Sequence, residues 1–271
     1  METILNFGGR RLALCTTSDR MVVVAGAWER HGICGYDAST GERLWQRRDL
    51  KRVQSLSPAG DGSAVAACFD SCLMQVLDAA SGTTIATVRA VRRFWQSRHV
   101  AIGAVEVLGH VALVGSDDWR VRWRAPVAGF ALLDAAFAPD AILVSDAVDS
   151  TFDANAVGSV YCFSLTGKLL WQRQPPPETN VPWLGWDTEA GEWLGIRHNV
   201  EKREPEMLLR WSRDGDQLSR VALGLVGEYA ILPAGRLLLA GQGDLVDTKA
   251  ARQVGRLPPP NSAAPEVGSS S

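Results

Sequence analysis

The chain is a succession of short apolar runs separated by polar turn residues, and this pattern continues as far as residue 257. The runs are rich in aliphatic, β-branched and aromatic side chains and too short for helices, which indicates β-strands. No segment shows the apolar spacing of a long, capped amphipathic helix. The pattern therefore predicts an all-β protein and excludes a helical solenoid.

A turn sequence repeats along the chain, at residues 36–47, 77–85, 163–173 and, more loosely, 211–218. In this sequence an Asp or Ser can cap the turn, a Gly supplies a positive φ, and an apolar strand follows, which is typical of a hairpin. Gly41 and Gly82 are 41 residues apart in the sequence, and Gly167 and Gly215 are 48 residues apart. A period of this length with several strands in each unit is typical of β-propeller blades.

Each unit is predicted to contain four strands, and six such units account for most of the chain. The predicted strands of the first three units are 11–16, 21–26, 32–37 and 43–47; 53–57, 63–68, 73–78 and 84–89; and 100–106, 110–115 and 119–124, with the outer strand of the third unit undefined. Those of the last three units are 130–135, 141–145, 158–163 and 169–173; 182–187, 192–197, 206–211 and 217–222; and 226–232, 235–241, 243–247 and 252–257.

We therefore predict a single β-propeller of four-stranded antiparallel blades over residues 1–257. Six blades are favoured, and seven is the alternative. A four-stranded blade buries both faces only between neighbours, so the ring has to close, and the apolar segment 2–7 is the predicted closing strand. Residues 258–271 are rich in Pro and Ser and are predicted to form a disordered tail.

The repeated turn resembles that of quinoprotein-like (PQQ-type) propellers, whose blades end in Asp, two variable residues, Thr-Gly, Lys or Glu, two variable residues and Trp. The matching residues are Asp37, Thr40, Gly41, Glu42 and Trp45, and again Thr166, Gly167, Lys168 and Trp171. Residues 112–123 are similar to a WD40-like blade, although no Trp-Asp dipeptide ends them. The resemblance implies the WD40-like or quinoprotein-like propeller superfamily. It implies no quinone cofactor, since quinoprotein dehydrogenases are longer, exported and carry adjacent paired cysteines.

Charge and cysteine content narrow the function classes. With 28 Lys and Arg against 30 Asp and Glu, the formal net charge is −2, which gives no field that attracts nucleic acid or an anionic membrane. The N-terminus lacks the basic and apolar regions of a signal peptide, and no run approaches the ~20 apolar residues of a membrane span. Five cysteines without framework spacing suit a reducing compartment. We expect a cytoplasmic protein, and its oligomeric state stays open.

Candidate chemistry is sparse. The acidic loop from Asp146 to Asp153 offers oxygen ligands to a hard cation, but its spacing is not that of an EF-hand, and a solvated loop is the preferred interpretation. Cys68 and Cys72 lack a second ligand pair for zinc. The four histidines are scattered over different units without a nucleophile motif or a phosphate loop. We therefore predict no catalytic residue, no metal and no cofactor.

Tryptophan and arginine side chains in or beside predicted loops favour protein binding, because both are enriched at interface hot spots. Since strands alternate in direction, loops between second and third strands share a face with connections between blades. The long predicted loops, including 90–99 and 116–118, belong to this set. The predicted partner-binding residues are Trp28, Arg92, Arg93, Trp95, Trp119, Trp183 and His198. The alternative is that these tryptophans cap the ends of blades.

The leading hypothesis is a non-catalytic protein-binding scaffold, acting as an adaptor, regulatory or toxin-neutralising subunit through its long-loop face. The second hypothesis is an enzyme or small-ligand binder with a polar site in the central pocket, built from His31, His198 and Asp149 or Asp153. A third is a structural repeat protein with no dedicated site.

Overall fold

The structure is a computed structural model, and it describes residues 11–26, 32–97, 100–107, 110–129, 131–147, 158–176, 179–199, 206–223, 229–231, 237–240, 244–250 and 252–256. These residues form strands and turns, and none of them belongs to a helix that could span a membrane.

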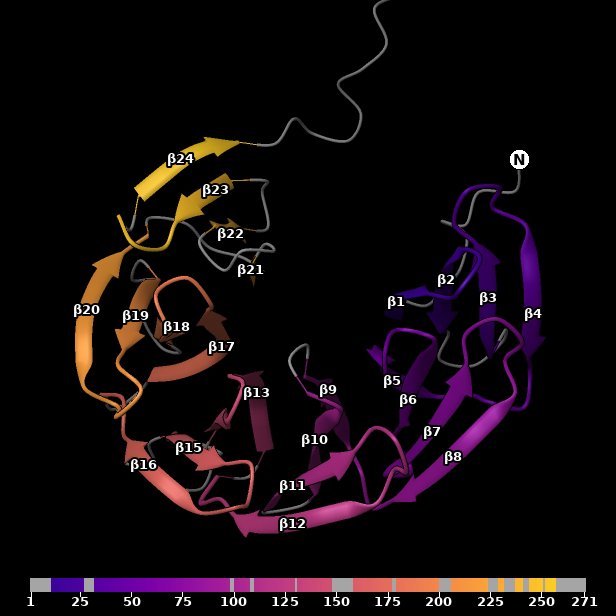
Figure 1. Ribbon diagram of the computed structural model, residues 1–271, viewed down its shortest axis with the longest axis horizontal. Helices are drawn as coiled ribbons and strands as arrows, with labels where there is room; N and C mark the ends of the chain where they lie inside the picture. The colour runs from indigo at the N-terminus through magenta and orange to yellow at the C-terminus, as the bar shows by residue number, and fades with distance from the viewer. Residues whose placement is uncertain are drawn as a thin grey trace, which may run out of the picture.

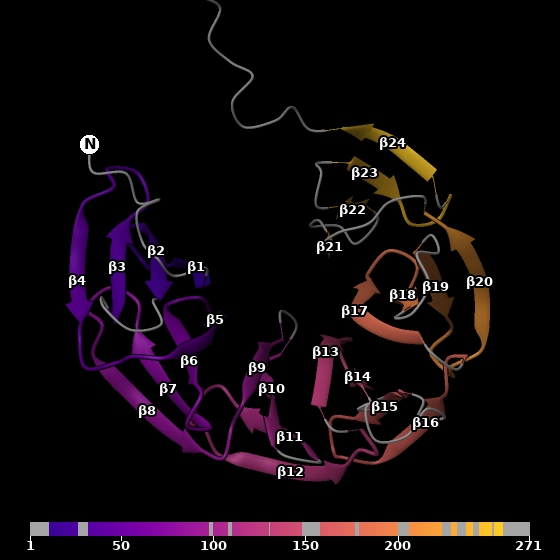
Figure 2. The same ribbon diagram turned by 180° about the vertical axis from the view of Figure 1, so that it is seen from behind.

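The strands form six antiparallel sheets, and each sheet contains four strands that are consecutive in the chain. The sheets follow one another in an arc, with the first strand of each sheet innermost and the fourth outermost (Figures 1 and 2). The first three sheets contain β1 (Arg11–Thr16), β2 (Met21–Gly26), β3 (Ile33–Asp37) and β4 (Arg43–Arg47); β5 (Val53–Ala59), β6 (Ala64–Phe69), β7 (Leu73–Asp78) and β8 (Thr84–Arg89); and β9 (Arg93–Gln96), β10 (Ile102–Val107), β11 (His110–Gly115) and β12 (Val121–Pro126). The last three contain β13 (Ala131–Phe137), β14 (Ala141–Ala147), β15 (Val160–Ser164) and β16 (Leu169–Arg173); β17 (Thr179–Asp187), β18 (Glu192–Asn199), β19 (Met207–Trp211) and β20 (Gln217–Ala222); and β21 (Tyr229–Ile231), β22 (Leu237–Ala240), β23 (Asp244–Asp247) and β24 (Arg252–Arg256).

The all-β prediction is confirmed, and every predicted strand overlaps an observed one. The third unit needs a correction, because its missing strand is the inner strand β9 and not the outer one. Strand β9 has four residues, pairs only with β10 and begins and ends on polar side chains, so the apolar pattern did not reveal it. As a consequence, the turn at 116–120 joins the third and fourth strands, and the connection between the second and third sheets is only residues 90–92.

Six blade-like sheets are described, while the number of blades in a complete ring and the closure of that ring stay predictions. The sheets β1–β4 and β21–β24 stand at the two ends of the arc in both views (Figures 1 and 2). The predicted closing strand at residues 2–7 and the predicted tail at 258–271 lie outside the described residues.

Most of the core consists of apolar clusters between neighbouring sheets, and a further cluster of Ala25, Cys34 and Tyr36 lies on the face of the first sheet that points away from the second. One cluster lies at each of the five junctions between successive sheets. At the first junction, for example, Val24 of the first sheet packs with Leu56 and Val65 of the second. Alternate side chains of a strand point to opposite faces, so each of the four middle sheets contributes to two clusters. Within the described residues, the first and the sixth sheet each contribute to only one junction.

At three junctions a tryptophan of one outer strand docks on the next sheet's turn between its third and fourth strands. The indole Nε1 atoms of Trp45, Trp123 and Trp171 donate to the backbone carbonyls of Ala79, Leu165 and Arg213, at 2.8, 2.8 and 2.7 Å. Each ring lies on the glycine of that turn, where an added Cβ would approach the ring to within 3 Å; these glycines are Gly82, Gly167 and Gly215. All three have positive φ. Within one repeated turn, the Gly therefore contacts the preceding sheet and the Trp contacts the following sheet.

The junction between the second and third sheets reverses this arrangement. Position 86, which corresponds to the docking tryptophan, is Ala86, and the position of the turn glycine is occupied by Trp119 with φ 58°. The Trp119 amide donates to the Gly115 carbonyl at 2.9 Å. In the other turns, the glycine amide donates in the same way to the carbonyl of the last residue of the third strand or of the residue after it. Both side chains pack against the same interface cluster, and the Trp119 ring lies 6.0 Å from that of Phe94. The indole is thus supplied by the turn instead of the strand.

At the junction between the fifth and sixth sheets, an arginine replaces the tryptophan. The buried Arg210 donates from Nη1 to the Thr248 carbonyl at 2.7 Å, and its guanidinium pairs with Glu192. The Thr248 hydroxyl donates to Asp187 at 3.0 Å. At four of the five junctions, therefore, a side chain of one sheet donates to the backbone carbonyl of the residue that comes directly after the capping residue of the next sheet's turn.

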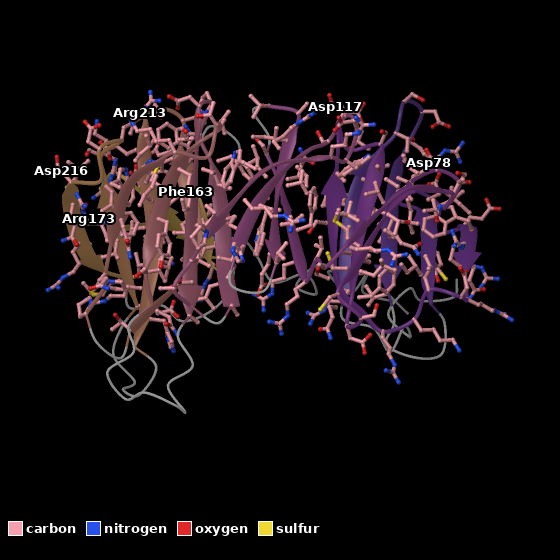
Figure 3. All side chains as sticks on the ribbon, turned by 90° about the horizontal axis from the view of Figure 1, so that it is seen from below. Asp78, Asp117, Phe163, Arg173, Arg213 and Asp216 are labelled. Atoms are coloured by element: carbon pink, nitrogen blue, oxygen red, sulfur yellow. The ribbon has the colours of Figure 1, made fainter. Side chains whose placement is uncertain are left out.

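The arc has two faces. We call the one that carries the connections between sheets and the turns between second and third strands, such as 48–52, 70–72 and 90–92, the loop face. The opposite one, which carries the remaining turns, such as 38–42, 60–63 and 116–120, is the turn face. Asp78, Asp117 and Arg213, from three different sheets, lie along the turn face in Figure 3.

We predict that Trp119→Gly lowers the free energy of unfolding by about 2 kcal/mol, because the lost packing outweighs the relief of a positive φ. Adding Ala86→Trp should restore most of this loss by recreating the arrangement of the other junctions. Chemical denaturation of the two single variants and the double variant measures the coupling. Additive effects of the two substitutions would contradict the reversed arrangement.

Candidate functional site

A polar pocket of about 330 Å³ opens on the loop face, where the inner strands of the first four sheets begin. Arg11 of β1, Arg93 of β9 and Ala131 of β13 contribute to it from the inner strands. The turn after β6 and the end of β10 complete its wall, with Asp70, Cys72 and Glu106. The pocket thus combines residues that lie up to 120 positions apart in the sequence, from Arg11 to Ala131.

Glu106 is the best-buried charged group of this pocket, with 3% of its side chain exposed. Its Oε1 lies 3.6 Å from Arg92 Nη1, and its Oε2 lies 3.8 Å from Arg93 Nε. Burial raises the pKa of Glu106, and the two guanidinium groups oppose this rise. A carboxyl in this position holds both arginines at the pocket wall, because separating the charges would leave it buried and uncompensated.

Arg93 keeps donors for a further partner. Arg93 donates from Nη1 to the Leu132 carbonyl at 2.9 Å, which ties the third sheet to the fourth. A guanidinium carries five N–H groups in a planar fork, so the contacts with Glu106 and Leu132 leave others for a carboxylate. Arg11 adds an exposed guanidinium, and Asp70 pairs with Arg52 at 3.3 Å. The pocket therefore suits an acidic group.

The backbone beside this pocket is strained at three residues. Arg52, Cys72 and Ala90 all have φ near +60° without being glycine, and all three lie on the loop face. The Val91 amide donates to the Cys72 carbonyl at 2.9 Å, so the turn after β6 is tied to the connection that carries Arg92. Strain of this kind costs on the order of 1 kcal/mol at each residue and is concentrated at functional sites.

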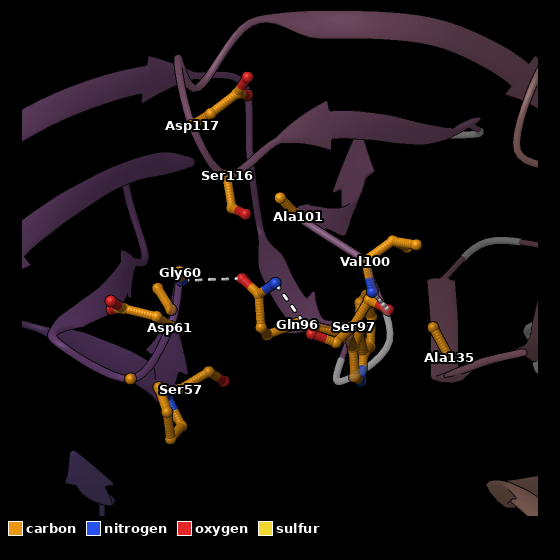
Figure 4. A pocket seen from close by; sticks show the side chains of 14 residues that line it. Ser57, Gly60, Asp61, Gln96, Ser97, Val100, Ala101, Ser116, Asp117 and Ala135 are labelled. Atoms are coloured by element: carbon orange, nitrogen blue, oxygen red, sulfur yellow. Dashed lines mark hydrogen bonds between the residues drawn. The ribbon is translucent and has the colours of Figure 1, made fainter. Parts of the chain in front are cut away.

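A larger cavity, of about 780 Å³, lies on the turn face between the second and third sheets (Figure 4). Gln96 lies near its middle, accepts a hydrogen bond from the Gly60 amide at 3.1 Å and donates to the Ile102 carbonyl at 2.8 Å. Trp95, Ala135, Asp61 and Asp117 also line this cavity. The cavity has the size of a small-molecule site.

A titratable carboxyl, that of Asp134, lies on an inner strand between the polar pocket and the larger cavity. Asp134 lies in β13 at a register shift, accepts a hydrogen bond from the Leu184 amide at 2.7 Å and interacts with the Trp95 indole. Burial raises the pKa of Asp134 to about 6, against the lowering effect of these donors. This group therefore changes charge close to neutral pH.

The seven predicted partner-binding residues do not form one site. Arg92 and Arg93 come together on the loop face, whereas Trp95 lies in β9 and lines the cavity of the turn face. Trp119 also belongs to the turn face, which corrects its predicted placement; the reason is the unrecognised strand β9, which shifted the strand count of the third unit by one. Trp28 lies outside the described residues.

The two remaining predicted residues lie in the fifth sheet. Trp183 of β17 packs, partly buried, against the cluster between the fifth and sixth sheets. His198 of β18 has its Nδ1 3.4 Å from the Oε1 of the buried Glu206. Sequence reasoning missed Glu106 and Arg11. The one available signal was Glu106 itself, a carboxyl within the otherwise apolar run Ile102–Val107.

The other candidate chemistry of the sequence is mostly structural. Asp146 is buried and accepts hydrogen bonds from the Gly129 and Ser159 amides at 2.7 and 2.6 Å and from the Tyr161 hydroxyl at 3.1 Å. The rest of the acidic loop, including Asp149 and Asp153, lies outside the described residues, as does His31. Cys68 is a buried core residue whose pKa is raised to about 12 by burial. Over the described ranges, no group of three His, Cys, Asp or Glu residues could hold a metal ion.

The six four-stranded sheets and their junctions define a fold of β-propeller type, and solved structures share this fold. The chain is similar to hydrazine synthase from Kuenenia stuttgartiensis, with a TM-score of 0.69 and 12% identity over 89% of this chain and 77% of that one. It is also similar to BamB from Moraxella catarrhalis, with a TM-score of 0.58 and 14% identity over 87% of this chain and 66% of that one. No protein-family model and no curated protein matches the sequence. Identity this low shows the fold alone.

We predict that Asp134 makes stability fall as the pH rises from 4 to 6. Its folded pKa of about 6 lies above the unfolded value of 3.8, so its stabilising proton is fully bound below pH 4 and lost through pH 6. Asp134→Asn, which keeps an oxygen acceptor, should remove this dependence and raise the free energy of unfolding at pH 7 by at most about 3 kcal/mol. Urea denaturation of both proteins between pH 4 and 8 measures the difference, and parallel curves would refute it.

Proposed function

We propose that this protein is a non-catalytic, protein-binding scaffold, and that its partner inserts an acidic side chain into the loop-face pocket. The observation that carries the proposal is the pair Arg92 and Arg93, held at the pocket wall by the buried Glu106. With Arg11, they place three guanidinium groups around one opening.

The chemistry of these groups favours a protein partner. Guanidinium groups recognise carboxylates through paired hydrogen bonds, and a positioned arginine loses little conformational freedom on binding. Arginine is also enriched among the residues that contribute most to protein interfaces. The pocket lies on a rigid scaffold beside strained connections, which is where binding residues commonly occur. A cytoplasmic location, the absence of nucleic acid and membrane partners, and ring closure by residues 2–7 remain proposals from the sequence.

We predict that Arg11→Glu weakens binding to an acidic peptide by roughly tenfold or more, because one charged hydrogen bond is lost and a repulsion is added. A fluorescein-labelled peptide of alternating Glu and Gly, measured by fluorescence anisotropy at low salt, supplies the probe. Arg11 is exposed, so the variant should fold normally.

Arg89→Glu is the matched control, since Arg89 is an exposed arginine of β8 outside the pocket. Both variants change the net charge equally, and only Arg11→Glu should lose binding. Equal losses in the two variants would mean that the peptide responds to overall charge, and the pocket would then not be the site. The same pair, used as bait in a native lysate, tests whether a physiological partner depends on Arg11.

The cavity on the turn face supports a second candidate function, the binding of a small polar molecule. Its volume of about 780 Å³ and its mixture of an indole, an amide and hydroxyl groups suit such a ligand. A thermal-shift screen of wild type beside Ala101→Phe, which fills part of the cavity, tests this candidate. A compound that stabilises only the wild type would favour it.

A further inference from the structure

The charges of the loop-face pocket, which we call the arginine pocket, do not balance among the described residues. Its charged lining consists of three arginines and two carboxylates, which are Arg11, Arg92, Arg93, Asp70 and Glu106. Asp70 is paired with Arg52 at 3.3 Å, so a fourth guanidinium belongs to the same group of charges. With both carboxylates ionised, these described residues leave two positive charges uncompensated.

Hydrogen-bond donors line the arginine pocket from three separate sheets. The guanidinium of Arg11 in β1 forms no ion pair or hydrogen bond with any described residue. Gln54 lies at a register shift of β5, where no residue of β6 pairs with it, and its side-chain amide also has no hydrogen bond within the described ranges. Arg93 of β9 keeps donors beyond its bond to the Leu132 carbonyl. The first, second and third sheets therefore each offer one donor group to the same pocket.

A phosphate monoester matches this charge and this arrangement better than a carboxylate does. A carboxylate carries one negative charge on two oxygens in one plane, whereas a phosphate monoester carries about −1.5 to −2 at pH 7 on three oxygens that point in different directions. Arginine clusters are a common means of recognising phosphorylated side chains. A single Asp or Glu, whether from a partner or from the rest of this chain, compensates only half of the excess charge.

The size and lining of the pocket favour a short phosphorylated side chain. Its volume of about 330 Å³ has room for a phosphate group and a short stem. Phe69, the one aromatic side chain among the described lining residues, is only 5% exposed. The ring of a phosphotyrosine would find little apolar surface to pack on, so the pocket suits phosphoserine or phosphothreonine.

We propose that the acidic group of the partner is a phosphoserine or a phosphothreonine, and that its phosphate accepts hydrogen bonds from Arg11, Gln54 and Arg93. This inference rests on the proposed function, because it names the group that the partner inserts into the arginine pocket. Phosphorylation of the partner then switches binding on, since an unmodified serine or threonine offers no charge to the arginines.

Three fluorescein-labelled peptides test the phosphate. They share one glycine-rich sequence around a central phosphoserine, glutamate or serine, and each is titrated with the full chain in fluorescence anisotropy. The phosphoserine peptide should bind at least about tenfold more tightly than the glutamate peptide, because it adds a charge and a further charged hydrogen bond. The serine peptide should not bind measurably.

The outcomes separate this inference from the proposed function. Equal affinities for the phosphoserine and glutamate peptides would overturn the phosphate and leave an acidic side chain as the occupant. If none of the three peptides binds, the phosphate is also wrong, and the peptide of alternating Glu and Gly decides separately on the proposed function.

Gln54→Leu tests whether the phosphate binds in the arginine pocket. It removes one donor without leaving any described group unpaired, and the phosphoserine peptide should bind roughly tenfold more weakly. Arg11→Ala, at an exposed position, should weaken binding similarly and replaces Gln54→Leu if that variant does not fold. Gln217→Leu is the matched control, since Gln217 is an exposed residue of β20 outside the pocket, and it should bind like the wild type. Unchanged binding by the pocket variants, or an equal loss in the control, would overturn the site.

Competition with inorganic phosphate distinguishes a phosphorylated protein from a free phosphate compound. The phosphoserine peptide also contacts the loop face around the pocket, so inorganic phosphate should displace it only at concentrations at least about tenfold above the dissociation constant of the peptide. Displacement at a concentration equal to that constant would mean that the pocket binds free phosphate, and the phosphorylated partner would be wrong.

Discussion

The contact between neighbouring sheets is the constraint on which this structure depends. A four-stranded sheet has two apolar faces, and each face leaves water only when another sheet packs on it. The indole or guanidinium that bonds to the next turn adds a direction to this nonspecific packing, because its N–H reaches one carbonyl only in one orientation of the two sheets. The glycine beneath the indole is then required by the close approach of the ring as well as by the positive φ.

The same constraint explains how far the sequence could be interpreted. The turn residues and their period predicted the positions of the strands, because Asp, Gly and Trp recur in the turns and outer strands through which neighbouring sheets contact each other. They failed at β9, where Arg93-Phe94-Trp95-Gln96 contains only two apolar residues and the junction uses Trp119 in place of a strand tryptophan. A search for the usual spacing of the turn glycine and the strand tryptophan misses this junction, because here the large residue is in the turn and the small one is in the strand.

The candidate site was harder to predict than the fold. Arg92 and Arg93 stood out as part of an arginine and aromatic cluster, but their partner Glu106 lies inside a run that an apolar reading assigns to the core. Their meeting depends on the pairing of β9 with β10, where Arg93 stands opposite Glu106. Arg11 joins them only through the arrangement of separate sheets around the inner strands. No local pattern encodes that proximity.

Because Glu106 is buried, the contacts that stabilise it in the fold also hold the two arginines of the proposed binding surface in place. A carboxyl that is 97% removed from solvent is unfavourable unless cations compensate it, so the fold keeps Arg92 and Arg93 beside it whether or not a partner is present. A partner then meets guanidinium groups that have already lost part of their freedom, and less of its binding energy is spent on ordering them. The arginines cannot be removed without leaving the carboxyl uncompensated.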